Sequence, residues 1–404
     1  MKRFGPGLLV MAAFIGPGTV TTASVAGANY GFALLWAVLF SIVATLVLQE
    51  MAARLGLVAR KGLAETLATT FKSQICRVLA ITLIVSAITF GNAAFEVGNI
   101  AGASMGLEVL TGFSARVWAL VVGAISAGLL AISFYRTLER LLVGLVVLMS
   151  FMFLMTMFIV QPSFTDMLAG MLIPRIPSGA LLTVVALIGT TVVPYNLFLH
   201  SSFVKEKWHK EVPLGQALTE SRIDTVVSIL LGGLITLAVV TTAATTFFAS
   251  GIEIVGAETM ARQLEPLLGP AAKYFFAVGL LSAGVTSAIT APLAAAYTMS
   301  GLLGWGMNMN DRRFRATWMM ILFIGTVFAT SGIRPVPAIV FAQAANGVLL
   351  PVVAIFLLIV MNRKDLLGDH RNGVLANCLG GLVVIIASGL GLFQLARVFG
   401  LVGI

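Results

Sequence analysis

Two short polar segments interrupt otherwise apolar stretches of this chain, and their residue types could bind a small ligand. Residues 16–19 read Gly-Pro-Gly-Thr, and residues 189–196 read Gly-Thr-Thr-Val-Val-Pro-Tyr-Asn. Proline removes a backbone N–H donor and glycine favours non-helical angles, so each segment predicts a broken helix. The freed N–H and C=O groups would line a site together with hydroxyls and one carboxamide. Because none of these groups is negatively charged, the predicted site is polar but neutral.

The elements that position these segments are membrane-spanning helices. The chain has 404 residues, of which 59% are hydrophobic and 10% are charged, whereas about 25% of residues are charged in soluble domains. A helix crosses the bilayer with about 20 apolar residues. Uninterrupted apolar runs predict eleven spans, at residues 8–27, 33–53, 79–101, 117–133, 141–160, 180–203, 223–249, 272–299, 316–331, 337–361 and 374–396. This composition excludes a cytosolic enzyme and a nucleic-acid-binding module, and it makes the lipid bilayer the main partner.

The basic residues predict the orientation of the spans. If the N-terminus is cytoplasmic, nineteen of the 25 Lys and Arg residues fall in cytoplasmic segments. This asymmetry is expected because Lys and Arg are retained on the cytoplasmic side of a membrane. We therefore expect a multi-pass protein of the plasma membrane with a cytoplasmic N-terminus and an extracellular C-terminus.

The acidic residue Glu96 lies within the predicted span 79–101, and Asn99 follows three residues later on the same helical face. An ionisable group within a membrane is expected to be functional. The structural alternative is a protonated carboxyl that hydrogen-bonds a neighbouring span. His200 has two corresponding interpretations, as a proton carrier or as a packed, hydrogen-bonding histidine.

The sequence does not support an enzyme. Its three histidines, His200, His209 and His370, are dispersed, and no nucleophile motif, phosphate-binding loop or metal-ligand cluster is present. We expect no catalytic residue and no cofactor.

The two breaks open the two halves of the chain. They fall in the first and sixth predicted spans, and interrupted helices at corresponding positions of two halves point to the binding site of a secondary transporter. Five spans per half is an odd number, so the halves are expected to be inverted. We expect one transmembrane domain over residues 1–404, with a first repeat at 1–160, a second at 180–361 and an additional helix at 374–396.

Several motifs resemble the Nramp transporters of divalent metals. Residues 30–36 (Tyr-Gly-Phe-Ala-Leu-Leu-Trp) and 48–56 (Leu-Gln-Glu-Met-Ala-Ala-Arg-Leu-Gly) are similar to the family's first loop and second span. Residues 193–202 (Val-Pro-Tyr-Asn-Leu-Phe-Leu-His-Ser-Ser) are similar to its sixth-span signature, Met-Pro-His-Asn-Leu-Tyr-Leu-His-Ser-Ser. The resemblance implies an all-α membrane protein with a LeuT-type fold, about eleven transmembrane helices, an inverted 5+5 repeat with helices 1 and 6 broken, and transport by alternating access.

The resemblance also implies a metal site, but the family's ligands are only partly present. The Asp and Asn of its first-span Asp-Pro-Gly-Asn motif correspond to Gly16 and Thr19, and its sixth-span Met corresponds to Val193. The tenth-span glutamine is present as Gln343. Metal binding would depend on Thr19, Asn196 and Gln343 at most, supplemented by carbonyls near Ala13 and Thr190.

Proton coupling is predicted to be altered as well. The family's third-span Asp and Glu correspond to Glu96 and Asn99, so one acid remains. The first histidine of the sixth-span signature is Tyr195 here, and the second is His200. The candidate substrate-binding residues are Ala13, Gly16, Gly18, Thr19, Thr190, Val193, Tyr195, Asn196 and Gln343.

Three functions remain open at this stage. The resemblance implies a divalent metal carrier, although the missing carboxylate and thioether argue against tight Mn²⁺ or Fe²⁺ binding. A small amino acid or carboxylate could instead bind the amino-terminal ends of the inner half-helices, which present free N–H groups and a positive dipole end. The third candidate is a membrane scaffold that transports nothing.

Overall fold

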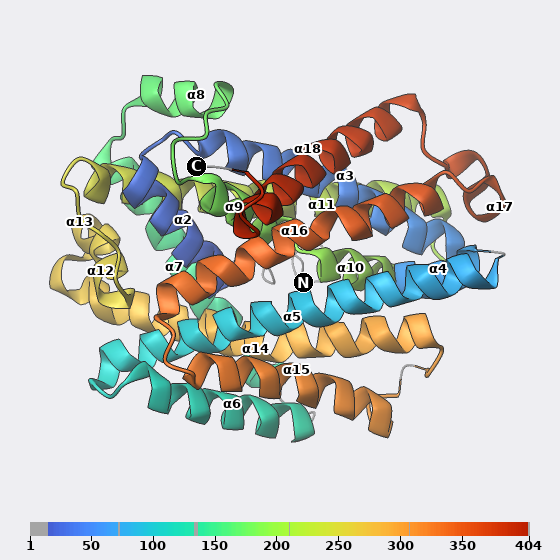
Figure 1. Cartoon of the computed structure of the whole chain (residues 1–404), viewed down its shortest axis with the longest axis horizontal. Helices are drawn as coiled ribbons and strands as arrows, with labels where there is room; N and C mark the ends of the chain where they lie inside the picture. Colours follow the sequence, from blue (N-terminus) through green and yellow to red (C-terminus); the bar gives the residue numbers. More distant parts are fainter. Residues whose placement is uncertain (1–14, 72, 133–135, 210, 307, 403–404) are drawn as a thin grey trace.

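A computed structural model describes residues 15–71, 73–132, 136–209, 211–306 and 308–402. Every regular element in this part of the chain is a helix (Figure 1). The elements before residue 180 are α2 (Pro17–Tyr30), α3 (Leu35–Ala59), α4 (Leu63–Thr70), α5 (Gln74–Thr111), α6 (Ala115–Ile132), α7 (Arg136–Val160) and α8 (Phe164–Leu172). The all-helical fold class is therefore confirmed.

The elements after residue 180 include several short connecting helices. The longer ones are α9 (Leu181–Thr191), α10 (Pro194–Lys207), α11 (Leu214–Ala243), α14 (Ala272–Leu303), α15 (Arg312–Thr330), α16 (Pro335–Met361) and α18 (Val374–Val398). The shorter ones are η1 (Ala244–Phe248), α12 (Ala257–Ala261), η2 (Arg262–Leu264), α13 (Glu265–Leu268), η3 (Gly269–Ala271), α17 (Lys364–Leu367) and η4 (Gly368–His370).

Helices occur at the positions of the predicted spans wherever the structure describes those residues. In the described part of the chain, nine helical segments are long and apolar enough to cross a membrane. The other two predicted spans are 8–27, whose beginning lies outside the described residues, and 316–331, which coincides with α15. The first four residues of α15 include three arginines. The third predicted span, 79–101, is too short at both ends, because α5 runs from Gln74 to Thr111.

The sixth span is broken where the sequence predicts. Between α9 and α10, Val192 and Val193 leave the helix, and Val193 has extended backbone angles (φ −76°, ψ 119°). Gly16 before α2 is also extended (φ −102°, ψ −176°). Pro17 and Pro194 each occupy the first turn of the following helix, where a missing N–H costs no helical hydrogen bond.

One end of the bundle carries ion pairs that join its helices. Figure 1 shows the long helices α5, α14 and α16 running across the view, with α12 and α13 at one end and α17 at the other. At the α17 end, Glu50 pairs with Arg54 and Arg222, each at 3.0 Å. Glu65 of α4 pairs with Lys205 of α10 at 2.9 Å. We call this the basic end, and the end with α12 and α13 the opposite end.

The two halves of the sixth span pack on different helices through close glycine contacts. A Cβ at Gly189 would lie 2.0 Å from the carbonyl oxygen of Gln343, so α9 is tight against α16. A Cβ at Gly56 would lie 2.1 Å from the carbonyl oxygen of Ser201, so α10 is tight against α3. Only glycine permits such approaches. The break therefore joins two half-helices that are anchored to different parts of the bundle.

Candidate functional site

The two breaks meet inside the bundle. The hydroxyls of Thr19 and Thr190 form a hydrogen bond of 2.8 Å, and both residues are buried. Gly16 lies beside α14, because a Cβ there would be 3.0 Å from Ser287 Oγ. The sequence predicted that the breaks converge, but Ser287 was missed because nothing in its local sequence distinguishes it from other hydroxyls in spans.

Helix ends of both signs point at the breaks. α2 begins at Pro17 and α10 at Pro194, and neither N-terminus has a side-chain cap among the described residues. Their free N–H groups give two positive dipole ends, while the C-terminus of α9 at Thr191 gives a negative one. From the breaks, α2 runs to the opposite end, where Gly31 meets Phe248, whereas α10 runs to the basic end. The two N-termini therefore cannot both belong to inner half-helices, contrary to the expectation from the sequence.

Two buried carboxamides have no partner at the break. Gln343 is fully buried and Asn196 is almost so. In the described part of the chain, both amide atoms of each residue lack a hydrogen bond. Gln343 lies directly over α2, since a Cβ at Gly18 would be 2.1 Å from its Nε2. Buried polar atoms without partners are rare in native proteins, so these groups are the best candidates to contact a ligand or water.

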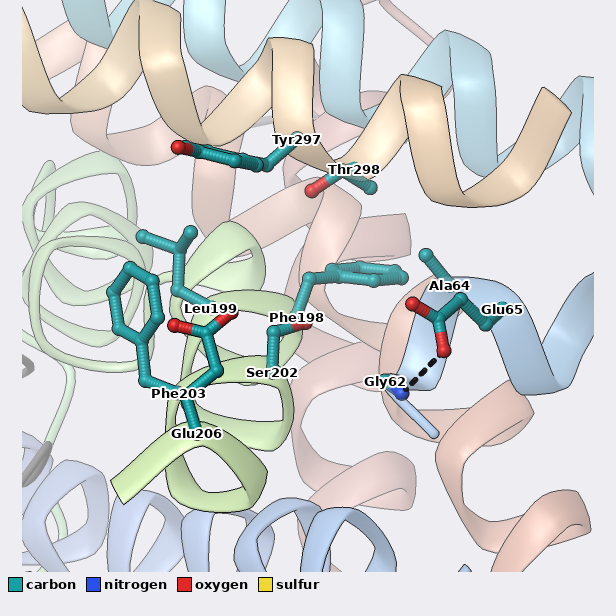
Figure 2. A pocket seen from close by; sticks show the side chains of 10 residues that line it. All are labelled: Gly62, Ala64, Glu65, Phe198, Leu199, Ser202, Phe203, Glu206, Tyr297 and Thr298. Carbon is teal, nitrogen blue, oxygen red and sulfur yellow. Dashed lines mark hydrogen bonds between the residues drawn. The ribbon is translucent and has the colours of Figure 1, made fainter. Parts of the chain in front are cut away.

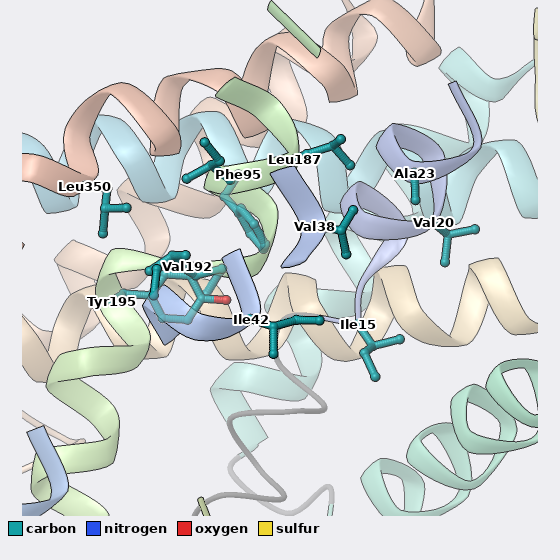
Figure 3. Close-up of a cluster of buried hydrophobic side chains, with 14 of the residues drawn as sticks. Ile15, Val20, Ala23, Val38, Ile42, Phe95, Leu187, Val192, Tyr195 and Leu350 are labelled. Atoms are coloured by element: carbon teal, nitrogen blue, oxygen red, sulfur yellow. The ribbon is translucent and has the colours of Figure 1, made fainter. Parts of the chain in front are cut away.

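An aromatic pair closes another wall of the site. Tyr195 and Phe95 pack edge to face, with ring centroids 5.7 Å apart. Figure 3 shows both rings with Val192 among the buried apolar side chains. The Tyr195 hydroxyl is buried and lacks a partner among the described residues. Val193 is buried and apolar, so its side chain gives the site no ligand atom.

Glu96 and Asn99 form a buried pair on α5. Asn99 Nδ2 donates to Glu96 Oε2 at 3.1 Å, which leaves Glu96 Oε1 and Asn99 Oδ1 unpartnered in the described structure. Glu96 is pressed against α15, because a Cβ at Gly325 would lie 2.4 Å from its Cγ. A Cβ at Gly98, which lies between Glu96 and Asn99 in the chain, would be 3.5 Å from Gln343 Nε2. The pair therefore lies on the stretch of α5 that contacts α15 on one face and Gln343 on another.

His200 lies one turn along α10 from Asn196 and contacts α3. Its Nδ1 forms a hydrogen bond of 2.7 Å with Gln49 Oε1, and its Nε2 lacks a partner among the described residues. The structure therefore does not bring His200 into the meeting point of the breaks. Ala13 lies outside the described residues.

Between the break and the opposite end lies a buried polar contact that the sequence did not indicate. Gln263 of η2 is fully buried, and its Nε2 donates to Ser24 Oγ of α2 at 2.8 Å. Thr242 of α11 donates to Gln263 Oε1 at 3.3 Å. Gln263 therefore joins α2 and α11 through a connecting segment, a link between residues far apart in the chain.

A cavity of about 140 Å³ lies at the basic end, between α4, α10 and α14. Figure 2 shows Glu65, Ser202 and Glu206 lining it, with Tyr297 and Thr298 on the facing helix. Two hydrogen bonds hold α4 against α10 beside it, from Leu63 N to Ser201 Oγ and from Lys205 Nζ to Glu65 Oε1. The break is thus separated from this cavity by the first turns of α10.

The meeting point of the breaks is uncharged. Its described residues are glycines, threonines, a serine, carboxamides, a valine and a tyrosine. In the part of the chain that the structure describes, no group of three His, Cys, Asp or Glu could hold a metal ion. The site can offer a ligand neutral oxygen donors, amide N–H groups and helix dipoles.

Comparison with known proteins decides the family. The family model described as natural resistance-associated macrophage protein-like, Nramp, matches residues 7–397. The chain belongs to the Nramp family. A relative from Verminephrobacter eiseniae, named divalent metal cation transporter MntH, is 30% identical over 375 residues, covering 92% of this chain and 83% of the relative. A relative of the same name from Caldanaerobacter subterraneus is 28% identical and covers 97% of this chain and 93% of its own.

Solved structures share the fold of this Nramp protein. A manganese transporter of Eremococcus coleocola, in complex with an aromatic bis-isothiourea compound, matches with a TM-score of 0.77 at 21% identity, covering 97% of this chain and 86% of its own. MhsT in complex with L-phenylalanine matches with a TM-score of 0.62 at 15% identity, covering 96% and 97%. The LeuT-type fold is confirmed, and the chain is a multi-pass membrane transporter rather than an enzyme.

Proposed function

We propose that this Nramp-family protein is an alternating-access carrier of a hard divalent cation such as Mg²⁺, which it binds weakly and with much of its water retained. The observation that carries this proposal is the pair of unpartnered carboxamides, Asn196 and Gln343, at the convergence of the two breaks. Mg²⁺ prefers oxygen ligands and gives up its water reluctantly, so neutral oxygens can contact its hydration shell.

The donor set disfavours soft transition metals. Val193 supplies no thioether, and Gly16 supplies no carboxylate. Soft ligands select for soft ions, and an isolated dication in an apolar interior is costly without anionic ligands. The two positive helix ends at Pro17 and Pro194 oppose a bare cation further. Mn²⁺ and Fe²⁺ are therefore expected to bind poorly, although two relatives are named divalent metal cation transporters.

Alternating access would use the break in span six as a hinge. α9 is anchored on α16 and α10 on α3, so a change of angles at Val192 and Val193 would move one anchor relative to the other. In this proposal, the hydrogen bond from Gln263 to Ser24 would keep the opposite end closed, and the bond from Leu63 N to Ser201 Oγ would keep α4 on α10. Breaking these contacts in turn would expose the site to one side and then the other.

A carrier of a small carboxylate or amino acid is the second candidate. The two uncapped N-termini, at Pro17 and Pro194, specifically favour it, because free N–H groups and positive dipole ends bind anionic groups. The two candidates differ in the charge of the substrate, which makes them simple to separate.

Uptake by proteoliposomes tests the proposal. Vesicles containing the purified protein are assayed with Mg²⁺, Mn²⁺ and a panel of amino acids and small carboxylates. We expect Mg²⁺ uptake that Gln343→Leu abolishes and that Gln394→Leu, a glutamine substitution in α18 outside the repeats, leaves intact. Uptake of a carboxylate alone would favour the second candidate, and no flux of any solute would favour a scaffold.

A further inference from the structure

A second cavity opens on the flank of the bundle and belongs to no part of the site described above. It has a volume of about 220 Å³ and lies between α7, α11 and α14. Phe151 of α7 and Leu231 of α11 stand at its rim and are 57% and 45% exposed. Both belong to segments long and apolar enough to span the membrane. The cavity therefore opens toward the surrounding lipid.

The cavity offers no polar group to an occupant. Only two described residues of its lining, Ser150 and Thr286, carry hydroxyls. Ser150 Oγ donates to Val146 O and Thr286 Oγ1 donates to Ser282 O, each at 2.8 Å within its own helix. The other lining side chains are hydrocarbon, including Ala283 at the base. An ion, a sugar or a lipid head group would find no partner here.

The position of the cavity along its helices indicates the depth in the membrane. Ser150 is near the middle of α7 (Arg136–Val160), Leu231 near the middle of α11 and Ala283 in the central part of α14. Because these helices cross the bilayer, their middles lie in its hydrocarbon core. At this depth the only abundant apolar molecule is the acyl chain of a membrane lipid.

We propose that this cavity binds one acyl chain of a membrane lipid beside the break of span one. Residues that line the cavity are next in the chain to residues that line the break. Ile15 lines the cavity, and Gly16 begins the break. On the facing helix, Thr286 lines the cavity, while Ser287 lies 3.0 Å from the Cβ position of Gly16. A bound chain thus contacts Ile15, the residue that precedes the break of span one.

Photo-crosslinking tests this proposal without any measurement of transport, so its failure is distinct from failure of the proposed function. The protein is purified in detergent, which strips loosely held lipid, and is given trace phosphatidylcholine with a diazirine in its acyl tail. Labelled residues are mapped by mass spectrometry. We expect Phe151 and Leu231 to be labelled about tenfold more than Leu382, an equally exposed lipid-facing residue of α18.

Filling the cavity supplies the matched control. Ser150→Phe should lower labelling of Leu231 about tenfold, whereas Val278→Phe should leave it unchanged, because Val278 lines a separate hollow of about 240 Å³ between α7 and α14. If Ser150→Phe does not purify as a monodisperse protein, Thr286→Leu replaces it. Labelling spread evenly over exposed residues, or unaffected by a folded cavity-filling variant, overturns the proposal.

Discussion

The carboxamide of Gln343 lies against the backbone of α2 at Gly18, where a Cβ would be 2.1 Å from its Nε2. This contact joins the tenth span to the broken first span at the centre of the bundle. It also explains why a glycine is needed two residues after Gly16. Because Gln343 fills the space that a Cβ at Gly18 would need, this contact determines how closely α2 and α16 approach at the site.

Adding a methyl group at Gly18 is expected to displace Gln343 and impair transport. Gly18→Ala should reduce Mg²⁺ uptake about tenfold while the protein still purifies as a folded species, because the clash falls on the end of a flexible side chain. Gly128→Ala is the control, since nothing lies within 4 Å of its Cβ position on α6. Equal uptake by both variants would contradict the placement of Gln343.

Restoring the missing ligands is expected to create a transition-metal site. The triple variant Gly16→Asp, Thr19→Asn and Ser287→Ala supplies a carboxylate and a carboxamide and removes the hydroxyl 3.0 Å from the Cβ position of Gly16. Calorimetry should show Mn²⁺ binding in the micromolar range, about −8 kcal/mol. Ser287→Ala alone should bind no better than the unaltered protein. No gain in the triple variant would mean that the backbone of the break differs from that of a metal site.

Glu96 is expected to carry any coupling to protons. The Asn99 amide holds one of its oxygens and leaves the other free. Glu96→Gln keeps the size and the hydrogen bond but cannot exchange a proton. An imposed proton gradient should accelerate uptake by the unaltered protein and have no effect on Glu96→Gln. If the variant responds to the gradient as before, Glu96 is a structural, hydrogen-bonded carboxyl.

Gln263 is expected to control access from the opposite end. Gln263→Leu removes the hydrogen bonds to Ser24 and from Thr242 with little change in volume. In a background with both native cysteines changed to serine, a cysteine placed by Thr190→Cys should react faster with a membrane-impermeant maleimide when Gln263→Leu is present. An unchanged rate would show that another contact closes this end.

The two native cysteines report the orientation of the chain. Cys76 and Cys378 are both exposed and follow loops at the basic end. If the basic end is cytoplasmic, as the distribution of Lys and Arg predicts, an impermeant maleimide should leave intact cells unlabelled and label inside-out vesicles. Labelling of intact cells would reverse the orientation.

Local sequence patterns predicted the helices and the breaks well, since both depend on residues close together in the chain. The apolar runs located the nine helical segments that are long and apolar enough to span a membrane in the described part of the chain, and Pro194 after Val193 located the break in span six. The ends of α5 and α15 were harder, because a membrane helix can continue into polar sequence such as the arginines that open α15. Nothing in the sequence marks where water replaces lipid as the solvent.

Long-range contacts could not be read from the sequence. Ser287 and Gln263 look like ordinary polar residues, and only folding places them beside Gly16 and Ser24. The local sequence also does not show that α2 and α10 leave the breaks toward opposite ends of the bundle, so the expectation of two inner half-helices with their N-termini at the site could not hold for both.

Calorimetry of the purified, unaltered protein with Mg²⁺ and Mn²⁺ tests most directly the claim that the meeting point of the breaks is an uncharged, oxygen-lined site. We expect Mg²⁺ to bind in the millimolar range, about −4 kcal/mol, with the signal lost in Gln343→Leu, and Mn²⁺ to bind no more tightly than Mg²⁺. A micromolar Mn²⁺ isotherm that Gln343→Leu abolishes would contradict the account.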